Sequence, residues 1–185
     1  MQTKEGVRSC LKKQAKQLLS SSFNQEDKAS VASLLQSPAY RQCTTLFAFS
    51  PLFDEVGISF VLEDALKHKK LALPVCLGDT LEFRFVRTGW RSEVQPSPLG
   101  VLEPLRGDVA APDSLSLILV PAMAYTPQGE RLGRGKGYYD RYLSQFPDIP
   151  TIGICRSYQL LDFVPTESWD MRVREVLCSG VFYRA

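Results

Sequence analysis

Short apolar runs of strand length alternate with segments of helical periodicity along most of this chain. The runs cover residues 44–49, 71–75, 117–120 and 152–155. Between the first two, residues 58–66 place apolar side chains on one helical face. Continuous apolar runs are typical of central parallel strands, because other elements cover both of their faces. We therefore predict an α/β protein, a three-layer α/β/α sandwich with a mostly parallel central sheet, folded as a single domain over residues 1–185.

Two helices are expected ahead of the first strand. Residues 7–19 carry apolar side chains at helical spacing, and this helix should end in the serine run at 20–22. A second helix should begin near Asn24, a favourable N-cap residue, and end before Pro38.

The other segments predict strands, a loop and a short helix. Residues 81–86 alternate in polarity, which indicates a half-exposed strand in a hairpin or at an edge. Residues 87–114 are rich in Pro, Gly and Ser and predict a long loop of the kind that often covers a site. A short helix is expected at 138–146 and a last strand at 173–178. Because ligands bind at the carboxyl ends of parallel strands, the loop after Val120 is the favoured place for a site.

Charge and apolarity are balanced as in ordinary globular proteins. The chain has 22 Lys and Arg against 20 Asp and Glu, a net charge of +2, and 44% hydrophobic residues. This argues against a nucleic-acid partner, which usually requires a large basic excess. No apolar run reaches the roughly 20 residues of a membrane helix, and charges near the N-terminus interrupt any secretory signal. We expect a cytoplasmic monomer that acts on a small molecule and has no membrane partner.

The cysteines are odd in number, widely spaced and in no metal-binding pattern. They are Cys10, Cys43, Cys76, Cys155 and Cys178. We expect them to be reduced and buried. A catalytic thiol would need a histidine partner, and the single histidine, His68, lies in the charged run 67–70, which is typical of a solvated helix end.

The segment 129–142, GERLGRGKGYYDRY, carries the strongest chemical signal. Three glycines alternate with two cations in the order Gly133, Arg134, Gly135, Lys136, Gly137. Such spacing lets the backbone adopt positive φ and present successive N–H groups to an anion. The start of the next helix and Arg131 add positive charge at the same place. Asp140 would supply the hard oxygen ligand that a magnesium ion bridging phosphate oxygens needs.

Other interpretations of this segment remain open. It matches neither the P-loop, GxxxxGK followed by Ser or Thr, nor the dinucleotide pattern GxGxxG directly after a strand. A glycine-rich surface turn with solvated cations is the plain alternative. Tyr138, Tyr139 and Tyr142 suit stacking on a heterocycle, but tyrosines at helical spacing more often pack in a core, with Tyr138 the favoured exception.

A longer pattern resembles a known family. Val120-Pro121 followed by Gly129-x-Arg131-Leu132-Gly133-x-Gly135-x-Gly137-Tyr138-Tyr139-Asp140 is similar to the signature of the 5-formyltetrahydrofolate cyclo-ligases, also called methenyltetrahydrofolate synthetases. The resemblance spans nearly the whole chain, although only the glycine signature is highly specific. Its supporting matches are Lys4 and Arg8, Asp54-Glu55-Val56, Pro74 and Glu103-Pro104.

The resemblance implies ATP- and magnesium-dependent cyclisation of 5-formyltetrahydrofolate to 5,10-methenyltetrahydrofolate, with release of ADP and phosphate. The ATP-binding residues that it implies are Lys4, Arg8, Arg131, Leu132, Gly133, Arg134, Gly135, Lys136, Gly137, Tyr138 and Tyr139. The folate-binding residues that it implies are Glu55, Arg134, Gly135, Lys136, Gly137 and Tyr138. Asp140 would hold magnesium. Without the resemblance, Glu55 beside Asp54 would be interpreted as part of a solvated turn.

The implied mechanism needs no protein nucleophile. The formyl oxygen attacks the γ-phosphoryl group, N10 then attacks the activated carbon, and phosphate leaves. Positioning and neutralisation of charge would supply most of the catalysis. Arg134 and Lys136 are the expected catalytic residues, and the planar fork of arginine and the point charge of lysine are not interchangeable.

Two departures from the family pattern stand out. After Asp170 the family usually has a second acidic residue before the last strand, where this chain has Arg174, followed by Glu175. The resemblance implies a metal ligand at that place, so magnesium would be held by Asp140, phosphates and water, or Glu175 would substitute. Tyr125 is followed by Thr126 rather than by an acidic residue. Two alternatives to the cyclo-ligase remain: another phosphoryl-handling α/β protein that keeps the nucleotide cradle, or a non-catalytic nucleic-acid-binding module whose tyrosines stack on bases.

Overall fold

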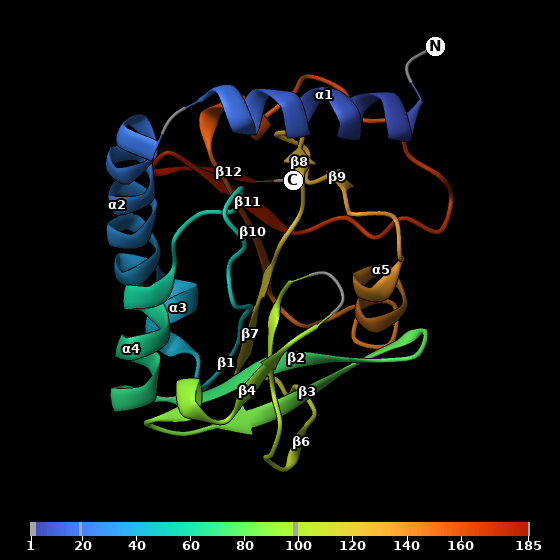
Figure 1. The fold of residues 1–185 in the computed structure, drawn as a ribbon. Coiled ribbons are helices and arrows are strands. Elements are labelled where there is room, and N and C mark those ends of the chain that lie inside the picture. The colour runs from blue at the N-terminus through green and yellow to red at the C-terminus, as the bar shows by residue number, and fades with distance from the viewer. Residues whose placement is uncertain (1–2, 19, 98–99, 185) are drawn as a thin grey trace.

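An eight-stranded sheet runs through the computed structural model, which describes residues 3–18, 20–97 and 100–184. Its strands are β1 (Thr45–Phe47), β2 (Lys70–Leu77), β3 (Thr80–Val86), β6 (Val109–Ala110), β7 (Ser116–Val120), β10 (Thr151–Cys155), β11 (Glu175–Cys178) and β12 (Val181–Arg184). Their order is β12-β11-β10-β7-β1-β2-β3-β6 (Figure 1). The five strands from β11 to β2 are parallel, whereas β12, β3 and β6 pair antiparallel. The prediction of a mostly parallel α/β sheet is confirmed.

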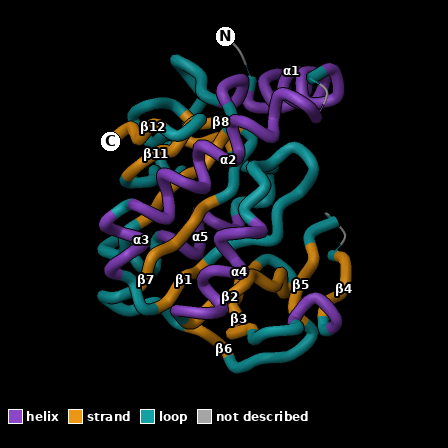
Figure 2. The backbone as a smooth tube through the Cα atoms, turned by 90° about the vertical axis from the view of Figure 1, so that its left-hand side faces the viewer, coloured by secondary structure: helices purple, strands orange, loops and turns teal. Residues whose placement is uncertain are grey.

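Helices cover both faces of this sheet and one of its ends. They are α1 (Lys4–Gln17), α2 (Ser20–Gln36), α3 (Pro38–Gln42), α4 (Ser59–His68) and α5 (Tyr138–Leu143). The helices α2, α3 and α4 lie together on one face (Figure 2), where Leu34, Tyr40 and Leu62 join a core cluster with the strands. On the other face α5 buries Tyr142 and Leu143. The helix α1 lies across one end of the sheet (Figure 1).

The short elements depart most from the sequence predictions. The helix α2 begins at Ser20 rather than near Asn24, and the last predicted strand begins at Glu175 and is followed by β12, which was not predicted. The predicted loop 87–114 contains β6, the 3₁₀ turn η1 (Trp90–Ser92) and a hairpin of β4 (Val94–Pro96) and β5 (Leu102–Pro104). Strands of two or three residues are too short for a period of two to be recognised.

The strand β3 forms a hairpin with β2, which is one of the two alternatives that the sequence predicted for this segment. Its turn is Gly78-Asp79, with Gly78 at φ +59°. The strand is not the sheet edge, because β6 pairs with its outer side. All five cysteines are free, but only three are buried: Cys10 is exposed and Cys76 is half-buried, which corrects the expectation that all are buried.

The strand order places the carboxyl ends of β1 and β7 side by side. From β1 the chain first adds β2 on one side and later returns to add β7 on the other side. Ligand sites in open α/β sheets lie at such switch points, because the loops that leave neighbouring strands diverge there. The loop after Val120 forms the small hairpin of β8 (Ala124–Tyr125) and β9 (Arg131–Leu132). This hairpin packs against Val7 and Leu11 of α1.

Among the described residues, no helix is long and apolar enough to span a lipid bilayer.

Packing between β8 and β10 leads to a stability prediction. Tyr125 is fully buried, its hydroxyl donates to the Val120 carbonyl, and a Cβ atom on Gly153 would overlap its ring. Gly153→Ala should therefore lower the free energy of unfolding by about 2–3 kcal/mol, as overpacked cores do. Chemical denaturation would measure this. The same change should cost much less in a Tyr125→Leu background, and an unchanged stability for Gly153→Ala alone would contradict the packing.

Candidate active site

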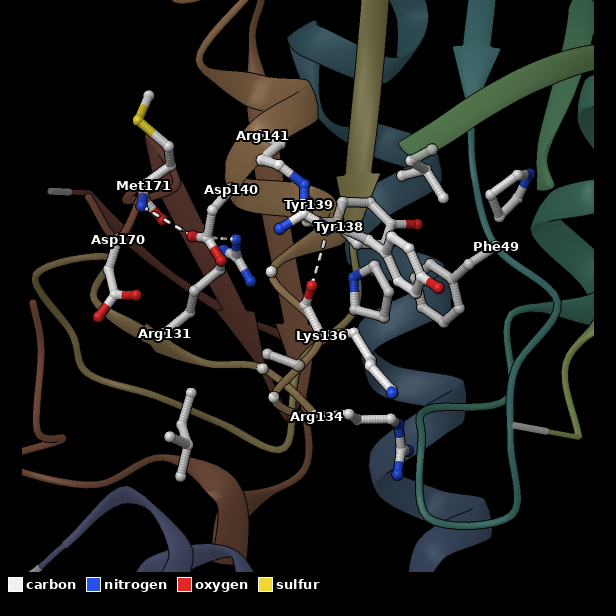
Figure 3. Close-up of a pocket in the computed structure, with 18 of the residues that line it drawn as sticks. Phe49, Arg131, Arg134, Lys136, Tyr138, Tyr139, Asp140, Arg141, Asp170 and Met171 are labelled. Carbon is white, nitrogen blue, oxygen red and sulfur yellow. Dashed lines mark hydrogen bonds and ion pairs between the residues drawn. The ribbon is translucent and has the colours of Figure 1, made fainter. Parts of the chain in front are cut away.

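A cavity of about 790 Å³ opens at the carboxyl ends of β1 and β7 (Figure 3). Phe49 and Ser50 enter it after β1, and Pro121 and Ala122 enter it after β7. The amino-terminal half of α1, the glycine loop with α5, and a later loop at 167–171 complete the wall. The strand ends and these three further chain segments thus build one site, as predicted for the loop after Val120.

The glycine loop forms the part of the wall between β9 and α5. Gly135 and Gly137 have φ of +101° and +67°, which the sequence predicts, whereas Gly133 does not have positive φ. Arg8 donates from Nε to the Gly133 carbonyl at 2.9 Å. Its guanidinium lies so close to Gly135 that a Cβ atom there would be 3.4 Å from Cζ. The helix α1 therefore holds the loop from outside.

Arg131 and Asp140 form a buried ion pair at one end of the cavity. The Arg131 Nη2 to Asp140 Oδ1 distance is 2.6 Å, and the Arg131 side chain is only 3% exposed. Arg131 also donates to the Met171 carbonyl, and Asp140 Oδ1 accepts the Met171 N–H at 2.9 Å. The expected ATP ligand Arg131 and the expected metal ligand Asp140 therefore bind each other, and both fasten the loop at 167–171.

Arg134 is held by two carboxylates. Its Nη2 lies 2.6 Å from Asp54 Oδ1 and 2.9 Å from Glu55 Oε1. Both carboxylates are buried, so the alternative of a solvated turn is wrong. Burial raises the pKa of Glu55 above its usual value, although Arg134 and the Leu52 N–H act in the opposite direction. Glu55 therefore lies in the cavity wall with much of its hydrogen-bonding capacity already used.

Lys136 is a cation of the glycine loop that has no carboxylate partner in the described part of the chain. Its ammonium group makes no hydrogen bond or ion pair with any described residue, and it extends with Arg134 away from the Arg131–Asp140 pair (Figure 3). Lys4 differs, because its Nζ is 2.5 Å from Asp170 Oδ2 and joins α1 to the loop at 167–171. An incoming anion would therefore meet Lys136 without first displacing a carboxylate.

The other side of the cavity is apolar and aromatic. Phe49, Pro74, Leu81 and Val101 line it together with Tyr138 and Tyr139. The Tyr138 hydroxyl donates to the Gly78 carbonyl, whereas the buried Tyr139 hydroxyl has no partner among the described residues. Tyr142 packs in the core 4.9 Å from the Phe83 ring centroid, as the core interpretation predicts. This side can receive a flat ring system.

Sequence reasoning assigned no role to several lining residues. Cys76 and Glu103 reach the cavity from β2 and β5, and Trp169 stands at its rim with 68% of its surface exposed. The Glu103-Pro104 pair was a signal for Glu103, but it carried no chemistry by itself. Nothing in the sequence around Trp169 placed it near the glycine loop.

The two departures from the family pattern lie outside the cavity. Arg174 donates to the Pro147 carbonyl at 2.9 Å and lines a separate hollow with Glu175 and Arg184, at the end of the sheet away from the loop. The Arg174 side chain does not face the cavity, so its presence in place of an acidic residue removes no group from the cavity wall, and Glu175 does not line the cavity either. Thr126 is fully buried, and its Oγ1 accepts the Glu130 N–H to close the β8–β9 turn.

The described residues hold no cluster of three or more His, Cys, Asp or Glu that could bind a metal alone. Asp140 uses Oδ1 for Arg131 and Met171, while no described residue donates to its Oδ2. Magnesium is commonly held by one or two carboxylates together with substrate phosphates and water. Asp140 fits that role for a metal that arrives with a nucleotide.

Comparisons with known proteins agree with this geometry. A sequence model of the 5-formyltetrahydrofolate cyclo-ligase family matches residues 1–179. The chain is 27% identical to the 5-formyltetrahydrofolate cyclo-ligase of Mus musculus over 187 residues, covering 94% of this chain and 92% of that protein. It is 30% identical to the mitochondrial 5-formyltetrahydrofolate cyclo-ligase of Arabidopsis thaliana over 162 residues, covering 78% of this chain and 58% of that protein. The NMR structure of Aquifex aeolicus 5,10-methenyltetrahydrofolate synthetase superposes with a TM-score of 0.86 at 25% identity, covering 98% of this chain and 92% of that chain.

The Arg131–Asp140 pair leads to a second prediction. Arg131→Ala would leave the Asp140 carboxylate and the Met171 carbonyl without this partner, so the free energy of unfolding should fall by about 3 kcal/mol. Arg172→Ala is the matched control, because Arg172 forms an exposed pair with Glu130 and should cost less than about 1 kcal/mol. Equal losses for the two variants, measured by chemical denaturation, would contradict a fastening role for Arg131.

Proposed function

The chain belongs to the 5-formyltetrahydrofolate cyclo-ligase family and is an enzyme of that family, and on this premise we propose that it closes 5-formyltetrahydrofolate to 5,10-methenyltetrahydrofolate with hydrolysis of ATP to ADP and phosphate. The observation that carries the proposal is the two-sided cavity. One side is apolar and aromatic, and the other combines a glycine loop with the uncommitted Lys136 ammonium. A folate ring and a polyphosphate need these two environments next to each other.

The reaction couples one phosphoryl transfer to one ring closure. The formyl oxygen attacks the γ-phosphorus, a new O–P bond forms, and the bond to the β-phosphate oxygen breaks to release ADP. N10 then attacks the formyl carbon, the C–O bond breaks to release phosphate, and the N10 proton passes to the departing phosphate or to water. In each step negative charge develops on the oxygen of a departing phosphate group, so a fixed cation and N–H donors lower the barrier of that step.

The residues of the chain divide this work. Lys136 would neutralise the γ-phosphoryl group during transfer, and the N–H groups of the glycine loop would orient the phosphates. Asp54 and Glu55 hold the Arg134 guanidinium in a fixed orientation, from which it would donate to phosphate oxygens. Lys4 and Arg8 would bring α1 to the nucleotide. Asp140 would hold magnesium, which supplies positive charge to the phosphate oxygens when it is bound.

The test of this function is a spectroscopic assay. Purified protein is mixed with 5-formyltetrahydrofolate, ATP and magnesium, and the absorbance of the methenyl product is followed, with ATP or metal omitted in controls. Product that depends on both supports the proposal. Nucleotide binding without product would instead favour another phosphoryl-handling protein. The monomeric state and the cytoplasmic location expected from the sequence stay predictions.

Removal of the Lys136 ammonium group gives the third prediction. Lys136→Ala should lower kcat at least about tenfold, a loss of at least about 1.4 kcal/mol of transition-state stabilisation. Lys67→Ala, at the exposed end of α4, is the matched control and should leave kcat unchanged. Unchanged kinetics for the Lys136 variant would remove this side chain from the mechanism.

The position of Arg174 gives the fourth prediction. Since Arg174 does not line the cavity, Arg174→Asp should leave the magnesium concentration for half-maximal activity within about twofold of the parent value. Asp140→Asn should raise that concentration by at least about tenfold. A metal requirement that changes in the Arg174 variant would show that this residue approaches the site during turnover.

A further inference from the structure

Glu103 is a buried carboxylate in the cavity wall, and no described cationic side chain pairs with it. Only 5% of its surface is exposed, and it lines the apolar side of the cavity. Its Oε1 accepts the Cys76 N–H at 3.2 Å, and it forms no ion pair with any described residue. The Cys76 thiol is also close to it: burial, and then a hydrogen bond to Glu103, raise the pKa of Cys76 to about 12.

A carboxylate in such a place needs donors from elsewhere. Burying a charged group without compensating hydrogen bonds costs several kcal/mol, so buried carboxylates are normally paired. Apart from the Cys76 N–H and thiol, no described residue donates a hydrogen bond to Glu103, and neither of these donors carries a charge. The Tyr138 hydroxyl donates to the Gly78 carbonyl, and the Tyr139 hydroxyl lies buried without a described partner on the same side of the cavity. A ligand with adjacent N–H groups would complete the hydrogen bonding of this carboxylate.

Glu55, the carboxylate that the family resemblance assigns to the substrate, is differently placed. Its Oε1 is bound by Arg134, and its Oε2 accepts the Leu52 N–H at 2.9 Å. Both of its oxygens are therefore engaged by the protein before any ligand enters. Glu103 has no such cation to displace.

We propose that Glu103 recognises the N–H edge of the substrate's aminopyrimidinone ring, accepting hydrogen bonds from the 2-amino group and the neighbouring ring N–H. This inference rests on the proposed function, because the substrate is the reduced folate of that reaction. The ring would lie between the aromatic and aliphatic residues of the cavity, with its donor edge toward β5. Paired N–H donors match a carboxylate, and such charge-assisted hydrogen bonds are about twice as strong as neutral ones.

The test compares two ligands by equilibrium calorimetry without ATP, so that catalysis is not required. The probes are 5-formyltetrahydrofolate and its 2-desamino analogue. The parent protein should bind the folate at least about tenfold more tightly than the analogue. Glu103→Gln should lose most of that preference, because the amide keeps an oxygen for the Cys76 N–H but presents an N–H group to the ligand's amino group. Glu103→Asp, which keeps the charge, should retain part of it.

Two matched variants separate the alternatives. Glu82→Gln changes a carboxylate on β3 that pairs with Arg84 outside the cavity, and it should keep the parent preference. Glu55→Gln tests the rival carboxylate. The inference is overturned if the preference survives in Glu103→Gln, if it is lost only in Glu55→Gln, or if Glu103→Gln weakens both ligands equally. A parent protein that binds both probes equally overturns the inference alone, whereas one that binds neither overturns the proposed function as well.

Discussion

The ion pair between Arg131 and Asp140 determines the shape of the site. It joins the first residue of β9 to the first turn of α5, and through Met171 it also fixes the loop at 167–171. The glycines between these anchors have little intrinsic preference for one conformation. Without fixed ends, the entropy of that loop would oppose the alignment of its N–H groups. A buried pair at the base therefore allows flexible residues to form a rigid wall.

Most of the other cationic groups in the cavity are also committed within the protein. Arg134 binds two carboxylates, Lys4 binds Asp170, and Arg8 binds a loop carbonyl. The carboxylate partners of Arg134 and Lys4 reduce the net positive charge of the cavity wall. Lys136 is left to respond to a ligand, and its effect is strengthened by the low polarity of the neighbouring aromatic side.

The sequence predicted the parts of the fold that depend on long, regular patterns. The four central apolar runs became β1, β2, β7 and β10, and the glycine segment lies at the carboxyl edge as expected. Short strands such as β5 and β12 were not predicted, because two to four residues are too few to show a period of two. The partners of Arg131 and Arg134 could not be foreseen either, since they come from residues 9 to 80 positions away along the chain. The position of Arg174 could not be foreseen for the same reason, because proximity to Asp170 in the sequence does not show which end of the sheet a residue faces.

The helix α1 contributes to the cavity through contacts that span almost the whole chain. Lys4 meets Asp170 across 166 positions and Arg8 meets Gly133 across 125. During synthesis this helix emerges before the hairpin and the loop at 167–171, so its contacts with them cannot form until both have been made. Contacts of such high sequence separation form late in folding, because their loop-closure entropy must be overcome first. Completion of the glycine-loop side of the cavity therefore requires that the chain has folded from α1 to the loop at 167–171, and a chain that ends before this loop would lack the contact between Lys4 and Asp170.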